Sequence, residues 1–395
     1  MNSGYITQAL DLISEKTLED EFSIGSSFPY VTAPSGEWTL MPASLSAGYS
    51  KDGWSHGNWF SGFWIGLLVA GSVHKGDKSL INLARERFQM VAPRATDGNT
   101  HDIGFLFWSS AVPLYNATGE SRFADVAVQA ANHLRARLVT THNGAYISSW
   151  GPLTDPRGRC SSAIDTMANL SLLYWAANYA GDASFRLAAE AHARMTRTSF
   201  IRPDNSTYHA VEYDLPSGKR SRGYTFQGYS DESAWTRGQG WAIYGYAETA
   251  AATGKIEYLE LAEQLAAYYL NRLGNDPVPF WDFDDPAIPH APRDSATAAI
   301  VAAAFLNMAD MHPDREKAAY WKGEAEKMLA ALCAGYLATE PQHRGILKHG
   351  CYSKPHNIGP DSAVLFGDYY FAEALMRLKA PGKFHNAWGT SALAG

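Results

Sequence analysis

Two kinds of helical segment alternate along the chain, and this alternation constrains the fold more than any other feature of the sequence. Segments of the first kind are amphipathic. In the one that follows Gly119, Phe123, Ala127 and Leu134 recur at helical spacing on one face, and arginines lie on the other. Segments of this kind begin near residues 5, 76, 119, 181, 254 and 314.

Segments of the second kind are apolar nearly all round, which predicts burial on most sides. They begin near residues 59, 101, 163, 236, 292 and 360. Six buried helices that alternate with six amphipathic ones predict an inner ring enclosed by an outer ring, which is an all-α (α/α)6 barrel. An open helical solenoid would not need six uniformly apolar helices. We expect residues 1–395 to form a single domain of this kind.

Polar and aromatic side chains gather at the N-terminal ends of the buried helices. In a ring of parallel inner helices these ends meet at one mouth, where six positive helix termini favour anionic ligands. Residues 206–229 alternate around a Pro-Ser-Gly turn and predict a small β-hairpin that could act as a lid. The residues at the helix starts are Trp59, His101, Asp102, Asp165, Arg237, Gln239, Arg293, Asp294 and Asp361.

Four of these residues are aspartates, and an aspartate at a helix start is a good N-cap. We expect Asp294 and Asp361 to be caps. Asp102 follows His101, and Asp165 stands at the head of an apolar helix, so each is either a cap or one half of a catalytic pair. Partial burial would raise the pKa of such a carboxyl group, as a general acid requires at neutral pH.

Other candidate site residues are cationic or polar. Arg237 lies between Trp235 and Trp241, where it could grip a carboxylate with two hydrogen bonds or form a structural cation–π clamp. His209 falls in the predicted hairpin, close in sequence to Gln227. The chain has no His-Glu-x-x-His motif, no paired cysteines and no Gly-rich phosphate loop, so we expect neither a metal nor a cofactor.

The composition narrows the classes of partner. The net charge is −7 and no basic run occurs, which argues against nucleic acid and anionic membranes. Aromatic residues make up 13% of the chain, which suits a pocket that stacks sugar rings but equally a large core. Three cysteines without paired spacing, and an N-terminal segment unlike a signal peptide, predict free thiols and a cytoplasmic protein.

Three strings, in this order, resemble the unsaturated glucuronyl hydrolases of glycoside hydrolase family 88. They are "HDIGF" from residue 101, "AIDTMANL" from residue 163 and "QGYSDESAWTRGQGWAIYG" from residue 227. The resemblance covers nearly the whole chain and implies the same (α/α)6 barrel. It implies a glycoside hydrolase that releases a 4,5-unsaturated uronic acid from the non-reducing end of lyase-generated oligosaccharides such as glycosaminoglycan fragments. The C4=C5 double bond is hydrated in this family, without direct displacement at C1.

The same resemblance implies roles for individual residues. By motif position, Asp165 resembles the general acid/base and Asp102 the second essential carboxylate. Two positions depart from the pattern, because Phe226 stands where some relatives have a histidine and Gly240 where alanine is common. The positions that resemble stacking or uronate-binding residues are Trp59, Trp150, His209, Gln227, Arg237 and Trp241, and Ser353 and Lys354 are candidate contacts for a sulphate group.

Three other interpretations stay open from the sequence. An unsaturated rhamnogalacturonyl hydrolase has the same barrel and chemistry, although "RGQGW" favours the glucuronyl group. A sugar epimerase on this barrel would use pairs of histidines, whereas aspartates stand at the helix starts here. A non-enzymatic helical scaffold would need an apolar outer surface rather than a polar, aromatic pocket.

Overall fold

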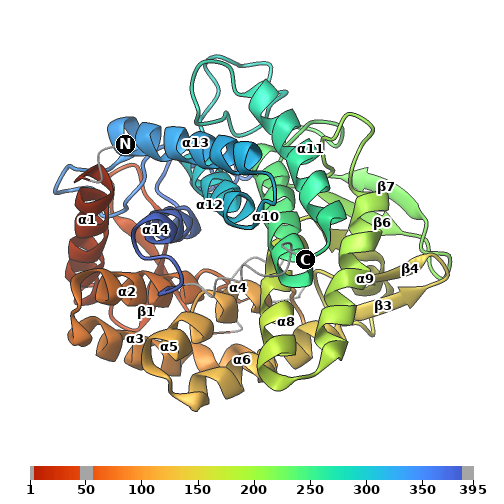
Figure 1. The fold of residues 1–395 in the computed structure, drawn as a ribbon, viewed down its shortest axis with the longest axis horizontal. Helices are drawn as coiled ribbons and strands as arrows, with labels where there is room; N and C mark the ends of the chain where they lie inside the picture. Colours follow the sequence, from red (N-terminus) through yellow and green to blue (C-terminus); the bar gives the residue numbers. More distant parts are fainter. Residues whose placement is uncertain (1–3, 45–56, 385–395) are drawn as a thin grey trace.

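The computed structural model describes residues 4–44 and 57–384, and its helices form two concentric rings (Figure 1). Each inner helix contacts the next, and α14 closes the ring against α2. The outer ring consists of α1 (Gly4–Glu21), α3 (Lys78–Val91), α6 (Ser121–Ala136), α9 (Ala183–Ser199), α11 (Ile256–Arg272) and α13 (Arg315–Ala331). The inner ring consists of α2 (Ser61–Lys75), α4 (Ile103–Trp108) with α5 (Ala111–Thr118), α8 (Thr166–Ala180), α10 (Thr236–Thr253), α12 (Ser295–Met311) and α14 (Leu365–Lys379). The predicted (α/α)6 barrel is confirmed.

Burial explains the two kinds of helix. In α12, every residue from 295 to 308 is buried, because other helices surround it. In α6, only the predicted face that includes Phe123, Ala127 and Leu134 is buried. Gly76 ends α2 in the left-handed conformation, with a φ of 72°, and the Asp77 carboxylate then accepts a hydrogen bond from the backbone N–H of Ser79 to start α3.

Two inner helices differ from the prediction. The helix expected near residue 101 is broken between α4 and α5, because the hydroxyls of Ser109 and Ser110 donate to the carbonyls of Phe105 and Leu106, and Pro113 lacks an N–H. The last inner helix starts only at Leu365. The prediction that Asp361 caps it was therefore wrong.

Short strands flank the rings. The predicted hairpin is confirmed as β6 (Ala210–Tyr213) and β7 (Arg220–Tyr224), which pair antiparallel. A third strand, β5 (Ser161–Ala163), pairs with β6 and leads directly into α8. The resulting three-stranded sheet lies beside α9 (Figure 1). The remaining short elements are β1 (Ser27–Thr32), β2 (Trp38–Pro42), η1 (Ala92–Thr96), β3 (Leu138–Thr141), β4 (Gly144–Ile147), α7 (Pro156–Cys160) and η2 (Leu332–Tyr336).

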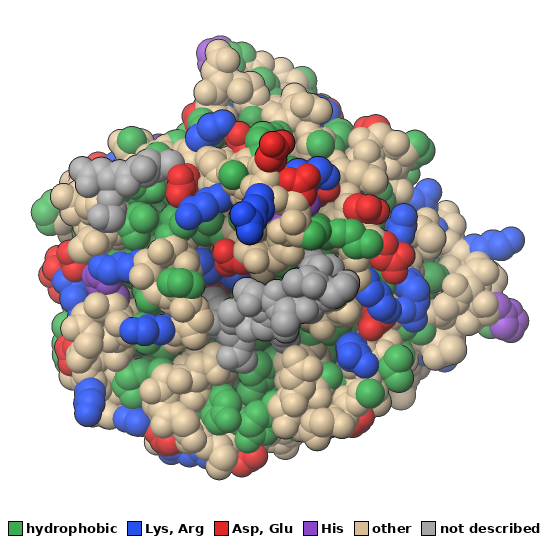
Figure 2. All heavy atoms as spheres, in the orientation of Figure 1, with side chains coloured by type: hydrophobic (Ala, Val, Ile, Leu, Met, Phe, Trp, Pro, Cys, Tyr) green, Lys and Arg blue, Asp and Glu red, His purple; other side chains and the backbone are tan. Residues whose placement is uncertain are grey.

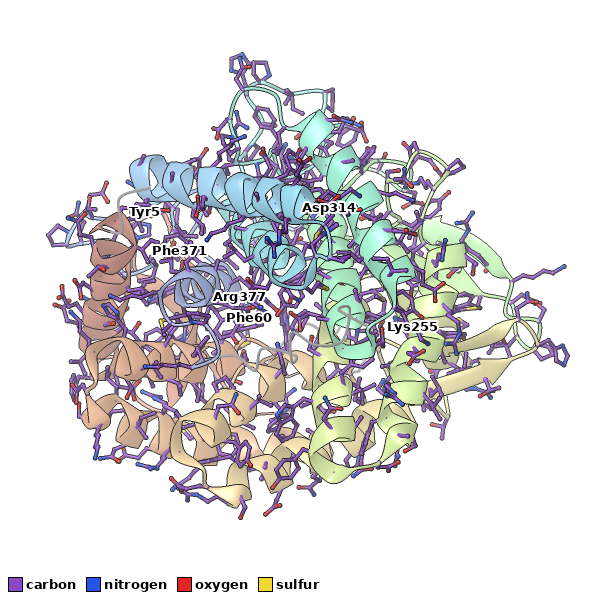
Figure 3. The ribbon with its side chains drawn as sticks, viewed as in Figure 1. Tyr5, Phe60, Lys255, Asp314, Phe371 and Arg377 are labelled. Carbon is purple, nitrogen blue, oxygen red and sulfur yellow. The ribbon has the colours of Figure 1, made fainter. Side chains whose placement is uncertain are left out.

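A buried ionic network joins three inner helices. Its cation is Arg377 of α14, which Figure 3 shows inside the ring. The Arg377 guanidinium lies 2.9 Å from Glu248 of α10 and 3.0 Å from Glu373 of its own helix. The side-chain amide of Asn307, on α12, donates to Glu248 at 2.8 Å. These contacts fix α10, α12 and α14 relative to one another.

Charged side chains of both signs are interspersed on the face shown in Figure 2. Among the described helices, none is long and apolar enough to cross a membrane.

We predict that Arg377→Ala lowers the free energy of unfolding by about 3–5 kcal/mol, because two buried glutamates lose their cation. Urea denaturation of the purified protein measures this. Arg122→Ala is the control, since Arg122 is half exposed and pairs with Glu120 at the surface, and we expect a loss of about 1 kcal/mol or less. Equal losses for the two variants would contradict the prediction.

Candidate active site

The starts of the inner helices bring the sequence-predicted residues together. Asp102 directly precedes α4, and Asp165 directly precedes α8. Neither carboxylate makes a capping hydrogen bond to its helix, so the cap interpretation does not account for them. Both side chains are largely buried, with 11% and 14% of their surface exposed.

Asp102 has two polar neighbours within its own loop. The hydroxyl of Thr100 donates to Asp102 Oδ2 at 3.0 Å, and His101 Nε2 lies 3.3 Å from Asp102 Oδ1. Burial raises the pKa of Asp102 to about 7, although the Thr100 hydrogen bond and the nearby Arg94 favour the ionised form. Arg94 itself is buried and pairs with Asp97 at 3.0 Å.

Asp165 has a different set of neighbours. Burial is the largest cause that raises its pKa to about 7, the negative charge of Asp102 raises it further, and Arg237 opposes both. The His209 imidazole approaches from the start of β6, with its Nε2 atom 3.8 Å from Asp165 Oδ2. This Nε2 is buried and has no hydrogen-bond partner among the described residues. Burial also holds the pKa of His209 well below its usual range, so the imidazole is neutral.

Asn169 ties the two aspartate-bearing helices together. Its Oδ1 accepts a hydrogen bond from the backbone N–H of Phe105 at 2.5 Å, and its Nδ2 donates to the carbonyl of Asp165 at 3.1 Å. The helices approach so closely here that a Cβ on Gly104 would lie 2.5 Å from Asn169 Cβ. The glycine of "HDIGF" and the asparagine of "AIDTMANL" therefore set the spacing of the two carboxyl groups.

An aromatic wall continues from the aspartates around the mouth. Trp59 stacks on Phe366 with ring centres 5.4 Å apart and lies 5.3 Å from Phe105, whose ring is 5.0 Å from Trp241. Trp59 is partly exposed, whereas Trp241 is buried. Trp59 can therefore present a face to a sugar ring, and Trp241 supports the wall from behind.

A second aromatic group lies at the hairpin. The ring of Phe226 packs edge-on against Trp150 at 5.2 Å, and it lies tilted against the His209 imidazole at 4.0 Å. Phe226 is 37% exposed, so an apolar face remains open beside the histidine. Trp150 also contacts the His101 ring, at 5.8 Å. This group connects the surroundings of Asp102 and Asp165.

Arg237 is engaged by the protein itself. Its Nη1 atom donates to Asp294 Oδ2 at 2.8 Å and to the carbonyl of Cys351 at 2.6 Å, and its Nη2 atom donates to the carbonyl of Tyr352. The guanidinium also lies over the Trp235 ring at 4.6 Å. These contacts fit the structural clamp more closely than a guanidinium reserved for a ligand carboxylate.

Asp294 is the third of the predicted aspartates that lies at a helix start, and the prediction that it serves as a cap was wrong. It occupies the N-cap position of α12 but makes no capping hydrogen bond to the backbone of that helix. Its carboxylate instead accepts from Arg237 and from the Thr297 hydroxyl. The buried guanidinium competes successfully for the carboxylate because each charge compensates the other.

The remaining predicted binding residues lie on, or contact, the segment that follows Cys351. Gln227 donates to the carbonyl of Tyr352 at 3.2 Å. Ser353 is buried and its hydroxyl lies 2.8 Å from His356 Nδ1. Lys354 Nζ donates to Asp285 at 2.6 Å, so its charge is already balanced. The described residues contain no group of three or more His, Cys, Asp or Glu side chains that could hold a metal ion.

Sequence reasoning missed several residues that shape the site. Asn169 was absent from the candidate list, although an amide four residues after Asp165 in an apolar helix lies on the same helical face. The phenyl rings of Phe105 and Phe366 carried no sequence signal beyond core hydrophobicity.

Two buried carboxyl groups among aromatic rings, at the mouth of a double helical ring, define an enzyme that acts on carbohydrates. No family model matches the chain. It is 34% identical over 363 residues to an unsaturated glucuronyl hydrolase from Bacillus sp. strain GL1, which covers 90% of the chain and 92% of the relative. It is 32% identical over 327 residues to an unsaturated chondroitin disaccharide hydrolase from Streptococcus agalactiae, covering 81% of each.

A crystal structure of the unsaturated glucuronyl hydrolase from Bacillus sp. GL1 superposes with a TM-score of 0.85 at 32% identity. The superposition covers 97% of this chain and 98% of that one. The chain belongs to the unsaturated glucuronyl hydrolase family, as the three sequence strings indicated.

We predict that Gly104→Ala lowers the free energy of unfolding by about 1–3 kcal/mol and also lowers kcat, because the new Cβ forces α4 away from Asn169. Gly240→Ala is the matched control. A Cβ there would lie 3.3 Å from Thr297 Cγ2, which is tight but tolerable, and alanine favours the helix by about 0.5–1 kcal/mol. Urea denaturation and steady-state kinetics measure both variants. A fully active, equally stable Gly104→Ala enzyme would refute the close approach.

We predict that Asp165→Asn gains stability relative to the wild type as the pH rises from 4 to 8. The folded carboxyl group has a raised pKa, so the folded state binds a proton more tightly than the unfolded chain does in this range. The wild type therefore loses stability as the pH rises through that window, and the neutral asparagine does not. We expect a relative gain on the order of 1–3 kcal/mol at pH 8 and none at pH 4. Thermal unfolding at each pH measures it, and a difference that is constant with pH contradicts burial as the cause.

Proposed function

We propose that the protein releases a 4,5-unsaturated uronic acid from the non-reducing end of an oligosaccharide by hydrating the C4=C5 double bond. The observation that carries this proposal is the pair of buried aspartates, whose pKa values are raised to about 7. A carboxyl group that keeps its proton near neutral pH can act as a general acid. Family membership supports the same conclusion, since the relatives are named for unsaturated substrates.

The proposed chemistry begins with proton transfer to carbon. The double bond is a vinyl ether and is nucleophilic at C4, so Asp165 delivers its proton there. Positive charge then develops at C5, next to the ring oxygen, and a water molecule adds to C5. The ionised Asp165 removes a proton from this water as a general base. The resulting hemiketal opens and expels the next sugar. Because one residue can give and take the proton, the usual spacing rule for two glycosidase carboxylates does not apply.

Other residues hold the substrate in this proposal. Asp102 accepts hydrogen bonds from the sugar hydroxyls, and Trp59 stacks on the uronate ring. The adjacent sugar rests on the exposed ring of Phe226 beside Trp150, which gives this chain a more apolar surface than a histidine would. Lys354 and Ser353 remain candidate sulphate contacts, and Lys354 would have to leave Asp285 to serve as one. We also propose a cytoplasmic location, on the strength of the three free cysteines.

We predict that Asp165→Asn abolishes nearly all turnover of an unsaturated disaccharide while the protein still folds. Asparagine has nearly the same shape as aspartic acid, and Asp165 makes no capping hydrogen bond that the change could remove, but asparagine cannot donate an acidic proton. The loss of ultraviolet absorbance of the conjugated double bond measures the rate, and circular dichroism checks the fold. Wild-type activity in this variant would eliminate Asp165 as the acid.

We predict that turnover in heavy water places deuterium at C4 of the uronic acid product, because hydration of the double bond adds a solvent-derived proton there. Product NMR gives the position of the label. Released sugar without deuterium at C4 would refute hydration and favour direct cleavage at C1, while leaving the fold and the family unaffected. Unsaturated disaccharides from chondroitin, hyaluronan, heparin and gellan, assayed side by side, would identify the preferred adjacent sugar.

A further inference from the structure

A chain of buried hydroxyl groups runs between the residues next to the two aspartates. The backbone N–H of Ala163 donates to Ser149 Oγ at 2.7 Å. Ser149 Oγ lies 3.1 Å from Thr166 Oγ1, which in turn lies 2.6 Å from His101 Nδ1. The three side chains are at most 1% exposed. Thr166 directly follows Asp165, and His101 directly precedes Asp102, so the chain links the two catalytic segments.

Only one set of hydrogen-bond directions leaves no hydroxyl proton of this chain unpaired. A backbone amide can only donate, so Ser149 Oγ accepts from Ala163. The other contact of this hydroxyl among the described residues is Thr166 Oγ1, so the Ser149 proton is paired when it points there, and a buried unpaired donor is costly. The Thr166 hydroxyl then accepts a hydrogen bond from Ser149 and donates a hydrogen bond to His101 Nδ1. Because Nδ1 accepts, a neutral His101 imidazole carries its proton on Nε2.

The Nε2 atom of His101 lies close to one aspartate. It is 3.3 Å from Asp102 Oδ1, without the alignment of a hydrogen bond, and the Thr100 hydroxyl donates to Asp102 Oδ2 at 3.0 Å. A hydrogen bond at one oxygen of Asp102 and a polar N–H group near the other both favour the ionised form. The Asp165 carboxyl group faces the His209 Nε2 atom, which is 3.8 Å away and beyond hydrogen-bond distance.

We propose that His101 is a positioning residue whose tautomer is fixed by Thr166 and Ser149, so that its Nε2–H group lies beside Asp102 and favours the negative charge on Asp102 and the proton on Asp165. The inference deepens the proposed function and depends on it for its catalytic consequence. The charge on Asp102 in turn raises the pKa of Asp165, which agrees with this order. The other charged and titratable groups that face the pair are Arg94, Asp97 and Arg137 for Asp102, and His209 and Arg237 for Asp165.

The tautomer itself provides a test that does not depend on activity. In protein labelled with nitrogen-15 histidine, the imidazole spectrum distinguishes a protonated from an unprotonated ring nitrogen, and His101→Gln identifies the His101 signals by their loss. We expect Nε2 to be protonated and Nδ1 unprotonated in the wild type at neutral pH. A His101 protonated on Nδ1, or on both nitrogens, overturns the proposal whatever the substrate proves to be.

The catalytic consequence is tested with Thr166→Val and Thr166→Ser. Valine removes the hydroxyl that donates to Nδ1 and keeps the shape, and serine restores the hydroxyl. We expect valine to lower kcat about fivefold to a hundredfold, the cost of leaving the buried Nδ1 atom without its donor, and serine to recover most of it. The acidic limb of the pH–rate profile should move to higher pH with valine, because Asp102 ionises less readily when the Nε2–H group of His101 is no longer held beside it.

Thr249→Val is the control, since the Thr249 hydroxyl is buried on α10 and bonds the Gly245 carbonyl and the Tyr174 hydroxyl. We expect it to leave the pH–rate profile unmoved. A lower kcat for Thr166→Val with an unchanged pH profile and an unchanged His101 spectrum would mean a merely structural hydroxyl, and the proposal would fail. If the wild type shows no hydrolase activity, the proposed function fails while the spectrum still decides the tautomer.

Discussion

The removal of two carboxyl groups from water is the interaction on which the rest of the site depends. Burial is the largest cause of the raised pKa of both Asp102 and Asp165. An open bundle would leave the helix starts wet, and both groups would be ionised at neutral pH. Closure of the ring by α14 against α2 therefore contributes to the chemistry as well as to stability. It also explains why the inner helices are apolar on every side.

Desolvation alone would treat the two aspartates alike, and the hydrogen bonds around them break this symmetry. Asp102 accepts a hydrogen bond from Thr100 of its own loop, whereas the Asp165 carboxyl group faces a neutral imidazole beyond hydrogen-bond distance. The two hydrogen bonds of the Asn169 side chain hold the two helix starts at a fixed separation, although the two carboxyl groups differ in charge. A small polar framework inside an apolar barrel is thus enough to give two identical side chains different roles.

Much of this arrangement could be predicted from the sequence, because helical periodicity and burial are local signals. The double ring, the hairpin and the placement of Asp102 and Asp165 at helix starts all followed from pattern. The partner of Asp294 did not, since Arg237 is 57 residues away from Asp294 in the chain and only the closed ring brings them together. The break between α4 and α5 could not be predicted from the sequence for a different reason. It depends on two serine hydroxyls, and a serine in a helix can hydrogen-bond either to the carbonyls of its own helix or to solvent.

The clamp around Arg237 changes where the attraction for an anionic sugar must come from. Its charge is balanced by Asp294 at 2.8 Å, and both side chains are at most 2% exposed. A compensated, buried pair exerts only a weak field at a distance. The starts of the inner helices carry the positive ends of the helix dipoles, although some of their N–H groups already have partners: Phe105 donates to Asn169 Oδ1 and Ser295 to the carbonyl of His349. The helix dipoles are therefore a local source of attraction for an anion in a chain whose net charge is −7, while Arg237 fixes the backbone at Tyr352.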